Sequence, residues 1–217
     1  MTTQVRALTW RKMALQALVG ALAGAGGMLA AMQLLEGEAL GWRPPQIILA
    51  GVGMIYLLMG LFVGLGIAVP ARIGQRLLNV ADAEEIVEER ASMGGSALTC
   101  IAIGATLALL AYSTVDGANA PVTTATAFWI MLTLLVAGTL VSIALWRGFD
   151  ELWRQLTIDA SAIAGNILLS VCVIWGGAAA AGLAAAPHPL HLISLAFGSF
   201  LLATFIAAGR RGMMTPQ

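Results

Sequence analysis

Long apolar stretches without charge restrict the fold of this chain more than any other feature. No Asp, Glu, Lys or Arg occurs between Lys12 and Glu36, or from Ala160 to Gly209. About 20 consecutive apolar residues form a helix long enough to cross the roughly 30 Å hydrocarbon core of a bilayer. Only 10% of the 217 residues are charged, whereas a soluble domain has roughly 25%. We therefore expect the bilayer to be the solvent for most of the chain.

Prolines and charges divide the chain into six predicted membrane spans. Pro44, Pro45 and Pro121 suit helix starts, and Pro187 and Pro189 divide the last charge-free stretch, which is too long for one span. The first stretch is longer than the apolar region of a signal peptide, so we predict that it is a retained helix. The predicted spans cover residues 13–35, 46–69, 93–112, 122–146, 160–183 and 190–208. The prediction is an all-α integral membrane bundle of six helices in three hairpins, forming a single transmembrane domain over residues 1–217.

The basic residues predict the orientation of this bundle. With six spans, all of the 11 Lys and Arg residues except Arg43 fall on the side that holds both termini. Short cytoplasmic loops carry an excess of Lys and Arg, so we predict that both termini are cytoplasmic. Arginine greatly outnumbers lysine, and Ala and Gly are abundant, which suggests a bacterial protein of the cytoplasmic (inner) membrane.

The only long hydrophilic stretch covers residues 72–92 and lies on the predicted cytoplasmic side. Its acidic residues include Glu84, Glu85, Glu88 and Glu89, which stand as like charges at i,i+4 if the stretch is helical. A solvated loop explains these residues. The alternative is a docking site for a basic partner protein or for a divalent cation.

Asp159, Asn166 and Ser170 form the clearest polar stripe in the predicted spans. Their spacing places all three on one face of a helix, beginning at its predicted cytoplasmic end. One interpretation is the mouth of an ion or solute path, in which Asp159 attracts a cation and Asn166 coordinates it. The other is structural: Asp159 is then an interfacial residue near a helix N-terminus, and Asn166 bonds to a neighbouring helix.

His188 and His191 lie three residues apart in the last turn on the opposite side. Two imidazoles are candidate metal ligands, with Glu36, Glu38 or Asp116 as oxygen ligands from the other turns on that side. Nothing in the spacing resembles a closed zinc site, and two histidines in a proline-rich turn are more often simply solvated. We therefore predict no bound metal and no cofactor.

Small residues at i,i+4 indicate close packing of the first two predicted helices. Gly20 with Gly24, and Gly60 with Gly64, follow the spacing that lets helix backbones approach each other in lipid. Cys100 and Cys172 both lie in apolar runs and are expected to be buried structural thiols.

No stretch of the sequence carries a recognisable catalytic motif. A glycine-rich phosphate loop, an H-E-x-x-H motif and a G-x-S-x-G elbow are all missing from the sequence. We predict a protein without enzymatic activity: an accessory, assembly or sensory membrane subunit that acts through helix packing and its cytoplasmic loop. The alternative is a small-solute or ion transporter or channel; an intramembrane enzyme is disfavoured. The expected partners are the lipid bilayer and another membrane or cytoplasmic protein. A net charge of zero gives no indication of nucleic acid.

Overall fold

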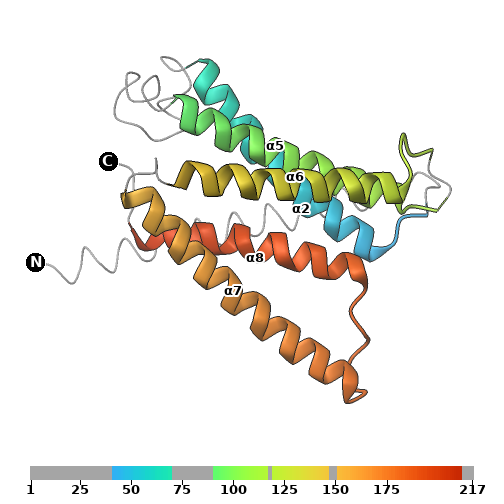
Figure 1. Cartoon of the computed structure of the whole chain (residues 1–217). Helices are drawn as coiled ribbons and strands as arrows, with labels where there is room; N and C mark the ends of the chain where they lie inside the picture. Colours follow the sequence, from blue (N-terminus) through green and yellow to red (C-terminus); the bar gives the residue numbers. More distant parts are fainter. Residues whose placement is uncertain (1–40, 70–89, 117–118, 147–150, 212–217) are drawn as a thin grey trace, which may run out of the picture. The chain divides into compact units, whose positions relative to one another are not determined.

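The computed structural model describes residues 41–69, 90–116, 119–146 and 151–211 (Figure 1). The chain divides into two units, Met1–Trp42 and Arg43–Gln217, and every described helix belongs to the second. The helices are α2 (Pro44–Ala68), α5 (Arg90–Ser113), α6 (Thr124–Leu145), α7 (Glu151–Ala180) and α8 (Pro189–Arg210). All 5 are long and apolar enough to cross a membrane. The predicted all-α class is thus confirmed, and the apolar helices are compatible with a membrane-embedded protein. The predicted first span at 13–35 lies outside the described residues.

Helix starts coincide with the proline and hydroxyl residues that the sequence places there. Pro44 and Pro45 occupy the first turn of α2, where a missing N–H costs no helical hydrogen bond. At the start of α6, the Thr123 hydroxyl accepts a hydrogen bond from the Thr126 N–H at 3.2 Å. α8 begins at Pro189 and has His188 as its N-cap.

Helix α7 begins earlier than the predicted span, at Glu151 rather than near residue 160. The polar segment before Asp159 continues the helix because its side chains satisfy one another locally. The Gln155 amide donates to the Glu151 carboxylate at 2.6 Å, and Arg154 lies 3.6 Å from the same carboxylate. Glu151 also stands in the first turn, where the helix dipole favours a negative charge. The apolar span is therefore only part of a longer helix.

The closest helix pair is α2 with α5, and glycines allow the two backbones to approach. A Cβ on Gly53 would lie 2.9 Å from the Gly104 carbonyl oxygen, and one on Gly104 would lie 2.5 Å from the Gly53 oxygen. A Cβ on Gly60 would lie 2.7 Å from the Ala97 oxygen. No room for a side chain remains at these three positions, as in other close helix contacts in membranes.

Helix α8 contacts both α2 and α7. The Tyr56 hydroxyl of α2 donates to the Phe197 carbonyl of α8 at 3.0 Å, and the two rings meet edge to face. Near the start of α7, the buried side chains of Leu156 and Ala160 pack against Ala207 close to the end of α8. Antiparallel packing of α7 on α8 follows from these contacts.

Further contacts join helix ends on the side where α2, α6 and α8 begin and α5 ends. The Thr124 hydroxyl at the start of α6 donates to the Ser113 carbonyl at the end of α5, at 2.7 Å. The start of α2, the turn after α5 and the start of α8 also share one cavity there. In the described part of the chain, polar side chains from different segments come together around this cavity and also where α7 begins beside the end of α8.

Candidate functional site

Three chain segments meet at a cavity of about 290 Å³ that has a mixed polar and apolar lining. We call its polar residues, Arg43, Gln46, Thr114, Asp116 and His188, the polar junction. Pro45 and Leu190 complete the lining. These residues come from the start of α2, the turn after α5 and the start of α8, so the junction holds the ends of three helices.

Gln46 is the buried centre of the polar junction, with only 6% of its surface exposed. Its amide nitrogen donates to the Thr114 carbonyl at 2.6 Å, and its amide oxygen accepts from the Arg43 backbone N–H at 2.6 Å. Both ends of the amide are therefore satisfied, as a buried polar group requires. The side chain links the first turn of α2 to the turn after α5.

Arg43 and Asp116 form an ion pair at the rim of the polar junction. The guanidinium lies 2.7 Å from the carboxylate, and both side chains are 71% exposed. Water screens an exposed pair, so its contribution to stability is about 0–1 kcal/mol. The pair keeps two opposite charges at the cavity but holds the helices together less than Gln46 does.

His188 contributes a titratable side chain to the same cavity. Its Nδ1 accepts a hydrogen bond from the Leu190 N–H at 3.2 Å and thereby caps α8. The backbone carbonyl of His188 accepts a second bond, from the His191 N–H at 2.9 Å. Leu190 is buried, so the cap positions an apolar anchor of α8 beside the cavity.

His191 lies beside the polar junction and packs on aromatic groups. Its ring centroid is 5.6 Å from that of Trp175 on α7 and 6.0 Å from that of His188. The Trp175 indole N–H donates to the Ala185 carbonyl in the connection between α7 and α8, at 3.0 Å. Both nitrogens of His191 are buried and have no hydrogen-bond partner among the described residues. The ring thus acts mainly as a packing surface.

The candidate metal ligands do not assemble into a metal site in the described part of the chain. His188 and Asp116 line one cavity, but no described group of three or more His, Cys, Asp or Glu side chains could hold a metal ion. Glu36 and Glu38 lie outside the described residues. The Asp116 carboxylate, moreover, is engaged with Arg43.

Two residues of the predicted polar stripe on α7, Asp159 and Asn166, make contacts that are structural in kind. Asp159 lies 2.6 Å from the guanidinium of Arg211, just beyond the end of α8, and Gln155 approaches the same guanidinium at 3.5 Å. The Asn166 amide donates to the Ala162 carbonyl one turn earlier in its own helix, at 2.8 Å. Asn166 and Ser170 are both exposed. No second helix contributes a described polar group beside Asn166, as a coordination site would require.

Of the predicted packing glycines, Gly60 lies in the α2–α5 contact, whereas no described atom lies within 4 Å of a Cβ built on Gly64. Gly20, Gly24 and the four glutamates Glu84, Glu85, Glu88 and Glu89 lie outside the described residues. Of the two cysteines, Cys100 is partly buried and Cys172 is exposed; both are free thiols.

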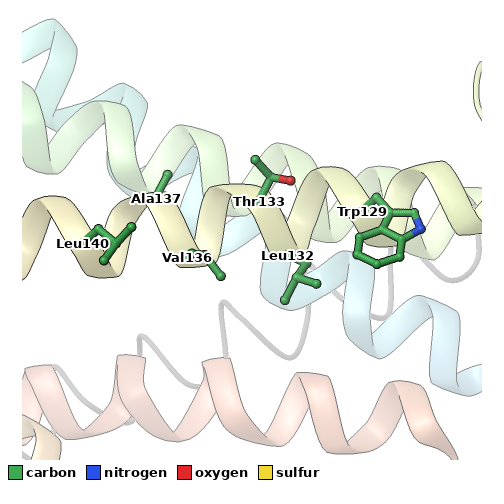
Figure 2. Close-up of a pocket in the computed structure, with 6 residues that line it drawn as sticks. All are labelled: Trp129, Leu132, Thr133, Val136, Ala137 and Leu140. Carbon is green, nitrogen blue, oxygen red and sulfur yellow. The ribbon is translucent and has the colours of Figure 1, made fainter.

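A second cavity, of about 350 Å³, is a shallow, open depression along one face of α6, and its lining is almost wholly apolar. Figure 2 shows its six lining residues, all from this one helix: Trp129, Leu132, Thr133, Val136, Ala137 and Leu140. The lining contains no charged group, and its polar groups are the Thr133 hydroxyl and the Trp129 indole N–H. Such a face suits hydrocarbon rather than a polar ligand.

The residues of these sites that were not singled out from the sequence include Gln46, Thr114, Trp175 and Arg211. The position of Gln46 directly after Pro44 and Pro45 could have predicted its capping role, because the side chain of the third helical residue commonly bonds back to the N-cap backbone. Arg211 was read only as a cytoplasmic charge. Comparison of the chain with protein-family models, curated proteins and solved structures gives no match.

Proposed function

We propose that the chain is a non-catalytic multi-pass protein of the bacterial cytoplasmic membrane, acting as an accessory, assembly or sensory subunit. In this proposal both termini and residues 72–92 are cytoplasmic, and the polar junction faces the other side. The apolar helices support the membrane setting, and the distribution of Lys and Arg supports the orientation.

The observation that carries the proposal is the pairing of Asp159 with Arg211 at 2.6 Å. Asp159 is the residue of the polar stripe best suited to attract a transported cation, yet its charge is balanced by an arginine. Asn166, the next residue of the stripe, is bonded within α7. These contacts favour a structural role for the stripe, and they weaken the transporter or channel alternative.

The exposed surfaces of α6 and α7 fit a protein that works by helix association. In an 18-residue apolar stretch of α7 none of the residues is buried, and in such a stretch of α6 only 6% are. Exposed side chains on α7 include Leu169, Val173 and Ile174. Lipid or the helices of a partner protein can cover such faces. The glycine-lined faces of α2 and α5, by contrast, are already packed against each other.

The predicted cytoplasmic stretch supplies the second part of the proposal. Its glutamates at residues 84, 85, 88 and 89 offer a concentrated negative charge to a basic partner surface. Contact through the stretch would add a salt-sensitive interaction to the packing of the helices.

Cross-linking in native membranes followed by purification of the full chain tests this proposal. The variant in which all four glutamates become Gln should lose a specific cross-linked protein that the unmodified chain retains. A matched variant with Glu36→Gln and Glu38→Gln, on the other predicted side, should retain it. Equal recovery of that protein with all three chains would count against docking through residues 72–92.

A further inference from the structure

His188 is an unusual helix cap because its acceptor atom can be protonated. Side chains that commonly cap helices accept through an oxygen. Here the acceptor is the imidazole Nδ1, which receives the Leu190 N–H at 3.2 Å. An imidazole that accepts at Nδ1 carries its own hydrogen on Nε2.

A second proton on His188 therefore enters at the nitrogen that makes the cap. The protonated Nδ1 is a donor and faces the N–H of Leu190, so the hydrogen bond is lost. The positive charge then stands at the N-terminus of the 22-residue helix α8, where the helix dipole is also positive. Both effects act against the capped arrangement.

The charged groups around His188 provide an alternative partner for the protonated ring. Across the cavity, the start of α2 supplies Arg43 and the turn after α5 supplies Asp116. On α8 the nearest titratable group is His191, whose ring centroid is 6.0 Å away, and from α7 the residue that packs here is the uncharged Trp175. Asp116 is the only described carboxylate that lines this cavity.

The ion pair that now holds Asp116 is weak enough to be exchanged. Both of its side chains are 71% exposed, and an exposed pair of this kind is largely screened by water. A protonated His188 released from its cap can compete with Arg43 for the Asp116 carboxylate. The exchange would draw the His188 ring toward the turn after α5 and away from Leu190.

We propose that the polar junction is a proton-sensitive contact, in which protonation of His188 uncaps α8 and transfers Asp116 from Arg43 to His188. In the capped state, the start of α8 is fixed beside the start of α2. In the protonated state, the first turn of α8 opens more often, and Leu190 loses its fixed position. The inference goes beyond the proposed function, since it concerns this chain alone and holds with or without a partner protein.

Amide hydrogen exchange in the first turn of α8 tests the inference, with the full chain in lipid nanodiscs. Rates at about pH 7.5 and about pH 5.5, each corrected for the intrinsic pH dependence of exchange, are compared. We expect the first turn to exchange roughly fivefold faster at the lower pH, in line with the loss of one helix cap. An unchanged corrected rate would overturn the inference.

Three variants assign the response to the His188 cap. His188→Asn keeps a capping acceptor that does not titrate, so its exchange should be slow at both pH values; His188→Ser serves in its place if the Asn chain does not fold. His188→Ala lacks a cap and should exchange fast at both. His191→Gln, the matched change at the neighbouring histidine, should respond as the unmodified chain does. A pH response that survives in His188→Asn, or that disappears in His191→Gln, would overturn the role of His188.

Discussion

At the scale of single residues, the extent of burial determines which contacts of the polar junction contribute most to stability. Gln46 is 6% exposed and bonds to two backbone groups, whereas Arg43 and Asp116 have side chains that are 71% exposed. Removing a buried partner leaves polar groups unsatisfied, which costs far more than removing a solvated charge.

We expect Gln46→Leu to lower the free energy of unfolding by about 1–3 kcal/mol, because the Thr114 carbonyl and the Arg43 N–H lose their partner. Asp116→Asn should cost about 1 kcal/mol or less, since it removes one member of an exposed pair. Reversible unfolding of each purified chain in mixed micelles measures both values. A larger loss for Asp116→Asn than for Gln46→Leu would contradict this ranking.

The pair of Asp159 and Arg211 is intermediate, with side chains that are 52% and 22% exposed. We expect Asp159→Asn and Arg211→Gln each to lower stability by about 0.5–1 kcal/mol, the upper range for a partly exposed pair. If the two side chains act through each other, the double variant should lose little more than either single one. Fully additive losses in this double-mutant cycle would show that the ion pair is energetically silent.

At the scale of single residues, the sequence identified candidate polar residues but not the residues that they contact. The sequence pointed to Asp159 and Asn166 because polar groups are rare in apolar helices, and to His188 because a second histidine stands three residues after it. The partner of Asp159 is Arg211, 52 positions away, and only the packing of α7 on α8 brings them together. The role of His188 as a cap depends on the geometry of the turn before α8, which residue spacing does not specify.

At the scale of helices, the α2–α5 pair depends on glycines that admit no side chain. Gly104→Ala would place a Cβ 2.5 Å from the Gly53 oxygen and 2.6 Å from the Leu57 nitrogen. Alanine stabilises a helix by about 1 kcal/mol relative to glycine, and overpacking costs about 1–3 kcal/mol or more. The atoms that clash belong to the backbone and cannot move away by a change of rotamer. We therefore expect the cost of overpacking to exceed the gain in helix propensity, so that Gly104→Ala destabilises the chain.

The matched control for this change is Gly138→Ala in α6, where no described atom lies within 4 Å of the added Cβ. It should be neutral or slightly stabilising. Thermal unfolding in nanodiscs compares the two chains. Equal melting temperatures for Gly104→Ala and Gly138→Ala would show that the α2–α5 contact is looser than described.

The positions at which helices begin were easier to predict from the sequence than the helices that pack against one another. Pro44, Thr123 and Pro189 mark starts through local rules of capping and proline geometry, and α2, α6 and α8 begin close to the predicted spans. The pairing of α2 with α5 was not predicted. Of the two glycines singled out in α2, Gly60 contacts α5, while the second close contact is made by Gly53, seven residues earlier. In helices that are apolar on every side, hydrophobic periodicity does not identify the packed face.

At the scale of the whole molecule, the side on which the N-terminus lies depends on whether residues 13–35 cross the membrane. Each crossing reverses the chain, so a sixth span at residues 13–35 would return the N-terminus to the side that holds the C-terminus. The excess of Lys and Arg on that side predicts the same result. The even number of membrane crossings and the distribution of Lys and Arg are separate arguments for the same orientation. Labelling of single cysteines from outside the cell tests both.

We expect Ala120→Cys and Ala186→Cys to react with a membrane-impermeant thiol reagent in intact cells, because both positions lie in turns on the side of the polar junction. Thr3→Cys and Thr215→Cys should react only after the membrane is permeabilised. The background chain carries Cys100→Ser and Cys172→Ser, since both native thiols are free. Labelling of Thr3→Cys in intact cells, with Thr215→Cys still protected, would mean that residues 13–35 do not cross the membrane. The reverse pattern at all four positions would instead invert the orientation and place the His188 cap in the cytoplasm, where its response to pH would follow the interior of the cell.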